Sequence, residues 1–505
     1  MSLNLATILR ESARAYPDKP AALFDGGQMT YRELDALSDR FAAGLRRSGV
    51  GRGDAVAVQL PNLPHFLIAY FGILKNGSVA VPLNVLLKAP EVEYHLADSS
   101  ASALITWSGV AAEAAKGAAG AGVQEIYVAE VGVPNTHGVG VPVENLVAGD
   151  DVPAPFELTE PGDTAVIVYT SGTTGRPKGA ELSHFQLFMN ADTPGRLFGI
   201  REDDVVLVTL PLFHVFGLSS ILNVCVRFGG TMSLVPRFEP DKVLQVMERD
   251  GVTVFEGVPT MYIALLNHPD TGRYNLSRLR IGISGGAPIP AEVLDGFERK
   301  FGIVILEGYG LSETASTTTF NVSAQERKIY SVGKPIWGVD VQIWDNEGNR
   351  LPPGADHPGE IVVRGVNTMV RYHNRPEATA EAFAGGWFHT GDIGYEDEDG
   401  FFFVIDRKKD LIIRGGYNVY PREIEEVLYA HPGVAEAAVV GVPHDLLGEE
   451  VKAYIELKPG ASVTEEELMA YAKERLAAYK YPRLVEIRAA LPKLGTGKIA
   501  KAELR

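Results

Sequence analysis

One stretch of the chain combines hydroxyl, glycine and lysine residues in a pattern that suits phosphate binding. It reads YTSGTTGRPKGA and runs from Tyr169 to Ala180. The apolar segment AVIV before it is expected to be a strand, and LSHFQLFMNA after it a helix. Backbone N–H groups and hydroxyls in such a loop can surround a phosphate, and Lys178 adds positive charge. The spacing is not that of a P-loop, because Gly179 and not Ser or Thr follows the lysine.

This stretch resembles the signature of the adenylate-forming superfamily, which includes acyl-CoA synthetases, peptide-synthetase adenylation domains and beetle luciferases. Four further segments resemble motifs of that family and occur in its order: YGLSET from Tyr309, GWFHTGD from Gly386, DRKKDLIIRGGYNVYPREIE from Asp406 and GTGKI from Gly495. Together the five matches cover essentially the whole chain. The resemblance implies an ATP-dependent ligase that activates a carboxylic acid as an acyl-adenylate and then transfers the acyl group to coenzyme A.

Activation of an acid brings two anions together, the carboxylate and the α-phosphate of ATP, so cationic groups must offset their repulsion. A metal ion and at least one lysine are therefore expected. Glu313 follows a predicted strand and could hold Mg²⁺ together with phosphate oxygens and water. The resemblance assigns the metal to Glu313 and Thr170 and makes Lys498 the main catalytic residue. It also places Thr314 and His214 among the catalytic residues, with His214 beside the acyl pocket.

The resemblance also implies a set of ATP-binding residues. Tyr309 and the SGGAP segment are expected to enclose the adenine, since purines stack well on aromatic rings. Asp392 is assigned to the ribose hydroxyls and Arg407 to the ribose or a phosphate. The complete set is Thr170, Ser171, Gly172, Thr173, Thr174, Gly175, Lys178, Gly286, Ala287, Pro288, Glu307, Gly308, Tyr309, Gly310, Asp392 and Arg407.

Transfer to coenzyme A requires that the catalytic lysine leave the acyl-phosphate, because it would obstruct the incoming thiol. By resemblance, the C-terminal domain rotates about Asp406 and withdraws Lys498. Gly415, Gly416 and Tyr417 then shape the tunnel for the pantetheine arm, where small residues allow a close approach of the backbone.

The elements that must position these residues change in character along the chain. Short β-branched runs alternate with helical segments over the first four hundred residues, which is typical of parallel sheets covered by helices. From about Ser331, closely spaced strands and turns indicate a β-rich subdomain. We therefore expect an α/β fold with residues 1–405 as an N-terminal domain that binds ATP and the acid. This domain would comprise two doubly wound α/β subdomains and the β-rich subdomain, and residues 406–505 would form a small mobile α+β domain.

Composition excludes several other classes of protein. The chain has 505 residues and a net charge of -17, which disfavours nucleic acid and anionic membranes as partners. Its longest apolar run, Phe66 to Leu74, is much shorter than the roughly 20 residues of a membrane-spanning helix. Cys225 is the single cysteine, and no signal peptide is recognisable, so a cytoplasmic location is expected. A homodimer is left open.

The sequence limits the class of acid substrate but does not identify the acid. The segments assigned to the pocket, PLFHVFGLSS, FEGVPTMY, ISGGAP and YGLSETASTTTF, contain no Lys or Arg, which disfavours a dicarboxylate. Gly217, Gly257 and Gly285 are expected to leave room for a chain or a ring. A medium- or long-chain fatty acid is the favoured substrate, with an aryl acid such as a hydroxycinnamate as the close competitor. Because the sequence ends at Arg505, no attached carrier domain is expected, although a separate carrier protein, a luciferase-like activity and a non-catalytic binding protein are alternatives.

Overall fold

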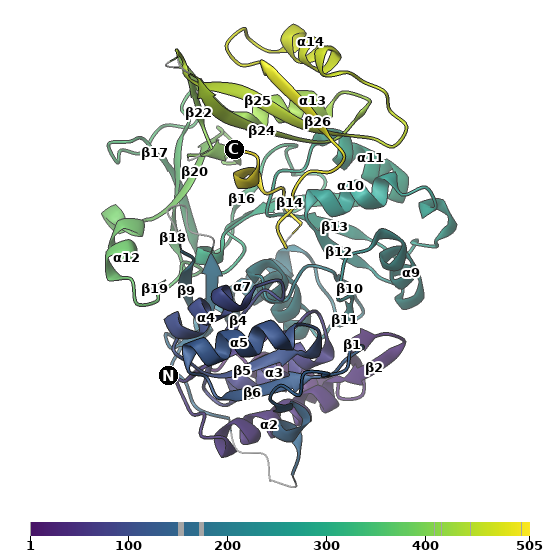
Figure 1. The fold of residues 1–505 in the computed structure, drawn as a ribbon, viewed down its shortest axis with the longest axis vertical. Coiled ribbons are helices and arrows are strands. Elements are labelled where there is room, and N and C mark those ends of the chain that lie inside the picture. Colours follow the sequence, from purple (N-terminus) through teal and green to yellow (C-terminus); the bar gives the residue numbers. More distant parts are fainter. Residues whose placement is uncertain are drawn as a thin grey trace.

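The computed structural model describes residues 2–149, 156–170, 176–408, 410–415, 417–444, 446–495 and 497–505. They form two large sheets covered by helices, a four-stranded antiparallel sheet and a smaller C-terminal sheet. Figure 1 shows the N-terminal part of the chain at the bottom and the C-terminal unit at the top. The predicted α/β class, with a large N-terminal domain and a small C-terminal one, is confirmed.

The first large sheet has nine strands, in the order β16-β15-β14-β13-β12-β10-β11-β1-β2. The six strands from β14 to β1 are parallel, and the edge strands β2, β15 and β16 are antiparallel to their neighbours. Their β-branched and apolar runs are buried, as expected for parallel strands covered on both faces. The strands are β1 Pro20–Phe24, β2 Gly27–Thr30, β10 Val205–Val208, β11 Thr231–Leu234, β12 Val254–Gly257, β13 Ile281–Ser284, β14 Val304–Tyr309, β15 Thr319–Phe320 and β16 Lys334–Pro335.

The second large sheet has eight strands, in the order β19-β9-β8-β4-β3-β5-β6-β7. The strands β8, β4, β3, β5, β6 and β7 are parallel to one another. At one edge, β9 is antiparallel to β8 and β19 is antiparallel to β9. The strands are β3 Ala55–Gln59, β4 Val79–Pro82, β5 Ala101–Trp107, β6 Glu125–Ala129, β7 Val141–Pro142, β8 Thr164–Thr170, β9 Lys178–Ser183 and β19 Arg371–Tyr372.

The phosphate-binding loop predicted between a strand and a helix connects two antiparallel strands instead. Strand β9 follows the loop and pairs with β8 in register, Thr170 opposite Lys178. Helix α7, His184–Leu197, begins only after β9, where Ser183 caps it in a capping box with Gln186. The prediction of a helix starting within LSHFQLFMNA was therefore early by two residues, and it missed the strand. Ser171, Gly172, Thr173, Thr174 and Gly175 lie outside the described residues.

The helices vary in length from one turn to nearly five. They are α1 Thr7–Ala15, α2 Tyr31–Arg47, α3 Pro64–Lys75, α4 Ala89–Asp98, α5 Ala111–Ala121, α6 Glu144–Val147, α7 His184–Leu197, α8 Val224–Arg227, α9 Pro240–Asp250, α10 Pro259–Asn267, α11 Ala291–Phe301, α12 Pro376–Ala382, α13 Pro421–Tyr429 and α14 Glu465–Arg475, with a π-helix η2 at Phe216–Asn223. Among the residues that the structure describes, none of these helices has the length and apolarity to cross a bilayer.

The β-rich subdomain and the C-terminal unit follow in sequence. An antiparallel sheet contains β17 Val339–Trp344, β18 Gly359–Gly365, β20 Phe388–Glu396 and β21 Phe402–Arg407. The C-terminal sheet contains β22 Ile412–Arg414, β23 Tyr417–Val419, β24 Val434–His444, β25 Gly448–Leu457 and β26 Leu484–Arg488. The C-terminal unit has its own hydrophobic core, formed by Ile412, Val439, Ile455 and their neighbours, separate from the core of the large sheets.

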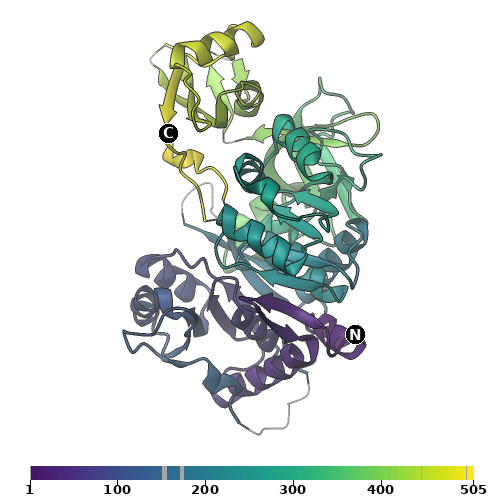
Figure 2. The same ribbon diagram turned by 90° about the vertical axis from the view of Figure 1, so that its right-hand side faces the viewer.

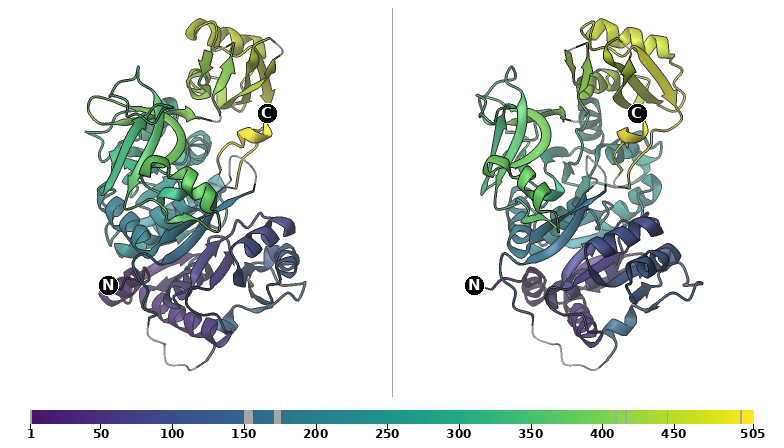
Figure 3. Two further views of the ribbon diagram at one scale, coloured as in Figure 1. Left: turned by 90° about the vertical axis from the view of Figure 1, so that its left-hand side faces the viewer. Right: turned by 60° about the vertical axis from the view of Figure 1, so that its left-hand side comes forward.

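The tail of the chain leaves the C-terminal unit and reaches the large domain. Figures 2 and 3 show it as a yellow loop that runs from the C-terminal unit toward the teal part of the large domain and returns, ending in a short helical turn. Thr260 at the start of α10 donates a hydrogen bond from Oγ1 to the carbonyl of Gly497, at 2.7 Å. The turn that carries Lys498 is thus fixed against residues that are distant in sequence.

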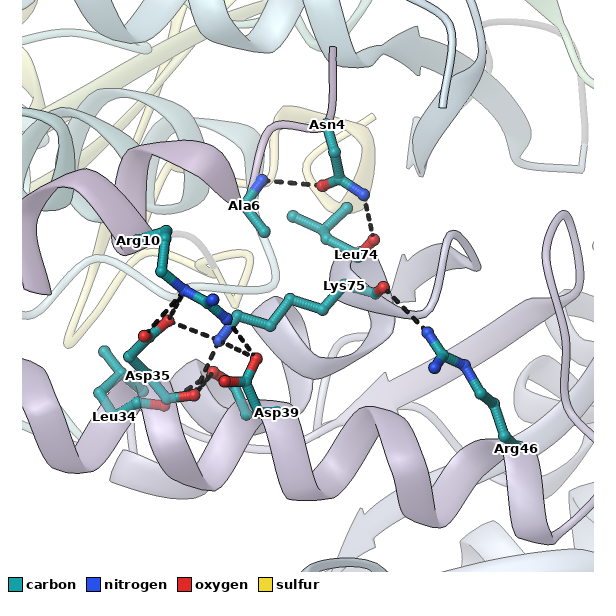
Figure 4. Close-up of polar contacts among 10 residues, drawn as sticks. Asn4, Ala6, Arg10, Leu34, Asp35, Asp39, Arg46, Leu74 and Lys75 are labelled. Atoms are coloured by element: carbon teal, nitrogen blue, oxygen red, sulfur yellow. Dashed lines mark hydrogen bonds and ion pairs between the residues drawn. The ribbon is translucent and has the colours of Figure 1, made fainter. Parts of the chain in front are cut away.

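A buried ionic cluster joins the first three helices. Lys75, whose side chain is 2% exposed, places Nζ 2.6 Å from Asp35 Oδ1 and 2.8 Å from Asp39 Oδ1. Arg10 pairs with the same two carboxylates, at 2.9 and 2.6 Å. Figure 4 shows the two cations and the two carboxylates facing one another between α1, α2 and α3. Every charge in this cluster therefore has an opposite partner.

Candidate active site

A cavity of about 1320 Å³ opens between the two large sheets, the β-rich subdomain and the tail. Its walls include loops that follow the carboxyl ends of parallel strands, which is the usual position of ligand sites in α/β sheets. Ten of the predicted site residues line it: Thr170, Lys178, His214, Gly286, Gly308, Tyr309, Gly310, Glu313, Arg407 and Lys498. Segments far apart in the sequence thus meet at one cavity.

Lys498 enters this cavity from the C-terminal tail. A side chain at Gly286 would lie only 3.2 Å from Lys498 Nζ and 2.8 Å from Cε, and Gly286 has a positive φ of +79°. A residue with a Cβ would therefore be strained at position 286 and would displace the lysine. Burial in the cavity, with the positive charge of Arg407 nearby, lowers the pKa of Lys498 to about 8, although Asp392 opposes the shift. No described carboxylate forms an ion pair with this ammonium group.

Asp392 lies directly behind the cavity wall and holds two of the lining residues. Its Oδ2 accepts a hydrogen bond from the Tyr309 hydroxyl at 2.6 Å, and its Oδ1 lies 2.9 Å from Arg407 Nε. Burial raises the pKa of Asp392, while the charge of Arg407 opposes this. The carboxylate thus orients the ring expected to stack on adenine and the guanidinium expected near the ribose.

His214 is neutral in the cavity. Desolvation, with the nearby charge of Lys498, lowers its pKa to about 3. Nδ1 accepts a hydrogen bond from the Phe216 backbone amide at 3.3 Å, so the proton of the neutral ring is on Nε2. The ring can therefore donate one hydrogen bond, but it supplies no positive charge near neutral pH.

Glu313 has the surroundings of a carboxylate that could bind a metal. Its Oε1 accepts a hydrogen bond from the Tyr372 hydroxyl at 2.9 Å, while the ammonium of Lys178 lies 5.2 Å from the centre of the Tyr372 ring. Within the described part of the chain, no group of three or more acidic, His or Cys side chains could hold an ion. Mg²⁺ does not require such a group, because it commonly binds one or two carboxylates together with substrate phosphates and water. Glu313, with Thr170 at the same cavity, therefore fits Mg²⁺.

Several predicted residues do not line the cavity. The hydroxyl of Thr314 is buried in its own turn, where it accepts a hydrogen bond from the Leu311 amide at 2.9 Å. Glu307 is buried behind the wall and accepts a hydrogen bond from the Ile289 amide, and burial raises its pKa to about 7. Ala287 and Pro288 also lie outside the lining. These residues are next to lining residues in sequence, but they do not reach the cavity because the side chains of neighbouring positions point in different directions.

The glycines expected to widen the acyl pocket are mostly filled by the protein itself. A side chain at Gly217 would meet the Pro211 carbonyl at 2.4 Å, and one at Gly257 would meet the Phe255 ring at 2.9 Å. Neither glycine lines the cavity, whereas Gly285 does and faces the Phe216 ring. The expectation that Gly217 and Gly257 leave room for substrate is therefore wrong, since their absent side chains permit close packing.

The segment predicted to contact coenzyme A lies on the C-terminal unit, away from the cavity lining. Gly415 has φ +58° and donates its amide to the Leu447 carbonyl at 2.8 Å. Tyr417 is 59% exposed and stacks on Tyr479, with 4.8 Å between ring centres. Gly416 lies outside the described residues. The structure therefore combines Lys498 in the cavity with this segment facing outward.

Sequence reasoning missed Tyr372, which links Glu313 to Lys178. It lies in the segment MVRYHN, which contains no catalytic residue type in a recognisable spacing. Only strand β19, which pairs with β9, brings it to the end of the phosphate-binding loop. No signal in the sequence alone could have identified it.

Comparisons with known proteins agree with this site. The AMP-binding enzyme family model matches residues 9–373, and that of the AMP-binding enzyme C-terminal domain matches residues 423–498. A long-chain-fatty-acid–CoA ligase of Bacillus subtilis is 39% identical over 99% of this chain and 94% of its own length. A feruloyl-CoA synthase of an Amycolatopsis species is 40% identical over 98% of this chain and 96% of its own.

A solved structure is similar over the whole chain. It is that of an anthranilate CoA ligase in complex with anthranoyl-AMP, which superimposes with a TM-score of 0.94 at 29% identity and covers 100% of this chain and 97% of its own. Both family models, the full-length relatives and the geometry of the cavity agree. The chain therefore belongs to the AMP-binding enzyme family, among the acyl-CoA synthetases of the adenylate-forming superfamily.

Proposed function

We propose that this ATP-dependent acyl-CoA ligase acts on a monocarboxylic acid with no second charged group, and that a medium- or long-chain fatty acid is the favoured substrate. The observation that carries the proposal is the distribution of charge in the cavity. Its cationic side chains, Lys178, Arg407 and Lys498 among them, come from the segments expected to bind the phosphates and the ribose. The wall formed by Phe198, Phe216, Ile283 and Phe320 is apolar, so a second carboxylate there would be desolvated without a counter-ion.

In the first half-reaction, an oxygen of the acid attacks the α-phosphorus of ATP and the bond to pyrophosphate breaks. Lys498 lies in the cavity without an ion-pair partner among the described residues, so its ammonium is available to both anions. Tyr309 and Arg407, held by Asp392, orient the nucleoside. Bound Mg²⁺, held by Glu313 with Thr170 nearby, would supply further positive charge to the phosphates.

In the second half-reaction, the thiol sulfur of coenzyme A attacks the acyl carbon and the bond to AMP breaks. We propose that residues 406–505 rotate as a domain about Asp406 between the two steps. Asp406 lies near the end of strand β21 and links it to helix α13, because its side chain accepts hydrogen bonds from the Arg407 amide at 2.8 Å and the Arg422 amide at 3.1 Å. The rotation would withdraw Lys498 and bring Gly415 and Tyr417 toward the cavity.

Two relatives support different acids. The Bacillus subtilis enzyme is a ligase of long-chain fatty acids, and the Amycolatopsis enzyme is a feruloyl-CoA synthase at nearly the same identity. An aryl acid is therefore the second candidate. An apolar wall is compatible with a chain and with a ring, because both bury apolar area.

A panel of acids tests the proposal. Purified enzyme with ATP, Mg²⁺ and coenzyme A should release AMP and pyrophosphate in equal amounts and consume one thiol for each acid. The panel should compare saturated acids of 6 to 18 carbons, cinnamic and benzoic acids, and matched dicarboxylates. The highest kcat/KM is expected for a fatty acid of medium or long chain. A preference for a dicarboxylate would contradict the proposal that the substrate has no second charged group. A preference for an aryl acid would favour the second candidate substrate over a fatty acid.

A further inference from the structure

Glu256 is a carboxyl group buried in the middle of the large sheet, on strand β12. It is 0% exposed. Neither of its carboxyl oxygens has a hydrogen-bond partner among the residues that the structure describes. Burial raises the pKa of Glu256 well above its ordinary value, so the group is a neutral acid with one O–H donor and free acceptor positions. Burying a carboxyl group without a hydrogen-bond partner costs free energy. Native proteins rarely do so unless water or a ligand supplies the partner.

Strand geometry places this carboxyl on the cavity side of the sheet. The preceding residue, Phe255, packs with Tyr262 and Phe297, which belong to helices α10 and α11 on the outer face. Successive residues of a strand point to opposite faces, so Glu256 points to the inner face. Its parallel neighbour in register is Ile283, which points to the same face and lines the cavity. The carboxyl group is therefore one strand away from the acyl wall and lies just behind it, outside the residues that line the cavity.

The helices that cover this face contain other polar groups without partners. Ser219 Oγ and Asn223 Oδ1, both on the π-helix η2, are buried and have no hydrogen-bond partner within the described part of the chain. Ser220, beside Ser219, lines the cavity. Helix η2 contacts strand β10, which is the neighbour of β12 in the sheet, so this helical segment covers the face to which Glu256 points. Oxygens without a described partner thus lie both on strand β12 and on the helical segment that covers it, next to the cavity.

The depth of Glu256 in the site follows from Val258. A Cβ at Gly286 would lie 3.2 Å from Lys498 Nζ and 3.7 Å from Val258 Cγ1, so the ammonium and Val258 flank the same point. Glu256 precedes Val258 by two residues, or roughly 6 to 7 Å along an extended strand. A group on the substrate that met Glu256 would therefore lie about that far beyond the carboxylate held near Lys498.

We propose that Glu256 is a binding residue for a hydroxyl group on the acid substrate, placed some way along the acyl part from its carboxylate. The proposal rests on the proposed function and refines it. Among acids with a single carboxylate, the enzyme would favour one that carries such a hydroxyl, on a chain or on a ring. The acid Glu256 would donate to, or accept from, that hydroxyl, and the apolar wall beside it would hold the hydrocarbon part. An internal water that satisfies Glu256 without the substrate is the competing explanation.

Matched pairs of acids test this site in the full-length enzyme. The measured quantity is the ratio of kcat/KM for a hydroxylated acid to that for its parent, with 4-hydroxycinnamic against cinnamic acid as the ring pair and hydroxydecanoic acids against decanoic acid as the chain pair. Glu256→Met removes both hydrogen-bonding oxygens at similar volume, and it should fold, because a buried group without partners is replaced by an apolar one. Glu256→Gln keeps a donor and an acceptor. Leu306→Met is the matched control, since Leu306 lies in register on the other side of Ile283.

The expected result is that wild type prefers the hydroxylated member of at least one pair, and that Glu256→Met lowers this ratio about tenfold, the worth of one hydrogen bond. Glu256→Gln should retain most of the preference, and Leu306→Met all of it. A ratio that stays the same in Glu256→Met, or no preference in wild type, would overturn the proposal and indicate internal water only. Failure of the proposed function would look different, because wild type would then release no AMP with any acid.

Discussion

Two lysines in this protein, Lys75 in the core and the half-buried Lys498, have opposite electrostatic surroundings. Lys75 has two carboxylates within 2.8 Å, and these also pair with Arg10 (Figure 4). Lys498 has no ion pair with a described residue and lies near a second cation, Arg407. The first lysine is neutralised by the fold, whereas the second keeps its charge available to a ligand.

The difference shows how the chain separates stability from chemistry. A buried cation that is fully paired joins helices, and its net contribution is modest because desolvation offsets much of the attraction. A cation without a partner destabilises the closed arrangement, but it can offset the charge of bound phosphates and carboxylate. Substitutions of Lys75 should therefore lower stability, and substitutions of Lys498 should lower catalytic activity.

The largest effect is expected for Lys498→Ala. Removing the ammonium should lower the rate of adenylation about 10³-fold, or about 4 kcal/mol of transition-state stabilisation. The free energy of unfolding should not fall, since no described ion pair is lost and an unpaired cation is removed. Pyrophosphate release measures the first half-reaction, and conversion of a supplied acyl-adenylate with coenzyme A measures the second. An equal loss in both would contradict a lysine that acts only in adenylation.

A somewhat smaller effect is expected for Lys75→Met. Asp35 and Asp39 would then share one buried face with only Arg10 to neutralise them, so the free energy of unfolding should fall by about 3 kcal/mol. Activity per folded molecule should remain unchanged. Urea unfolding followed by circular dichroism measures the first quantity and active-site titration the second. Lys116→Met is the control, because Lys116 is exposed and pairs only with Glu113 one turn away. A loss of activity per folded molecule in Lys75→Met would contradict a purely structural role for Lys75.

The smallest effect concerns pH. Lys498 has a pKa of about 8, lowered from its ordinary value, and it is protonated below that pH. The kcat/KM for adenylation should therefore fall about tenfold per pH unit above pH 8, and His214, with a pKa of about 3, should add no change near neutrality. In Lys498→Arg this alkaline decline should disappear, since arginine stays charged. A decline that remains near pH 8 in that variant would assign it to another group.

Much of the site was predictable because its residues lie in contiguous motifs. Tyr309 and Glu313 are four residues apart, and Lys498 lies in a short glycine-flanked turn. All three line the cavity, as their motifs implied. Thr314 does not, because a residue next to Glu313 in sequence faces the interior of the turn. A motif indicates which segment reaches a site, but the direction of each side chain depends on local backbone conformation.

The sequence by itself determined the alternation of strands and helices in the large domain, the separate C-terminal unit and the segments that carry charge to the substrate, because periodicity and motif spacing are local properties. Tertiary structure alone decided that Lys75 meets two carboxylates, that Gly286 leaves space for Lys498, that Tyr372 supports Glu313, and that Glu256 lies beside the acyl wall without a partner. The physical reason is that pairing, desolvation and packing depend on distances between segments remote in sequence, and these exist only once the sheets have formed.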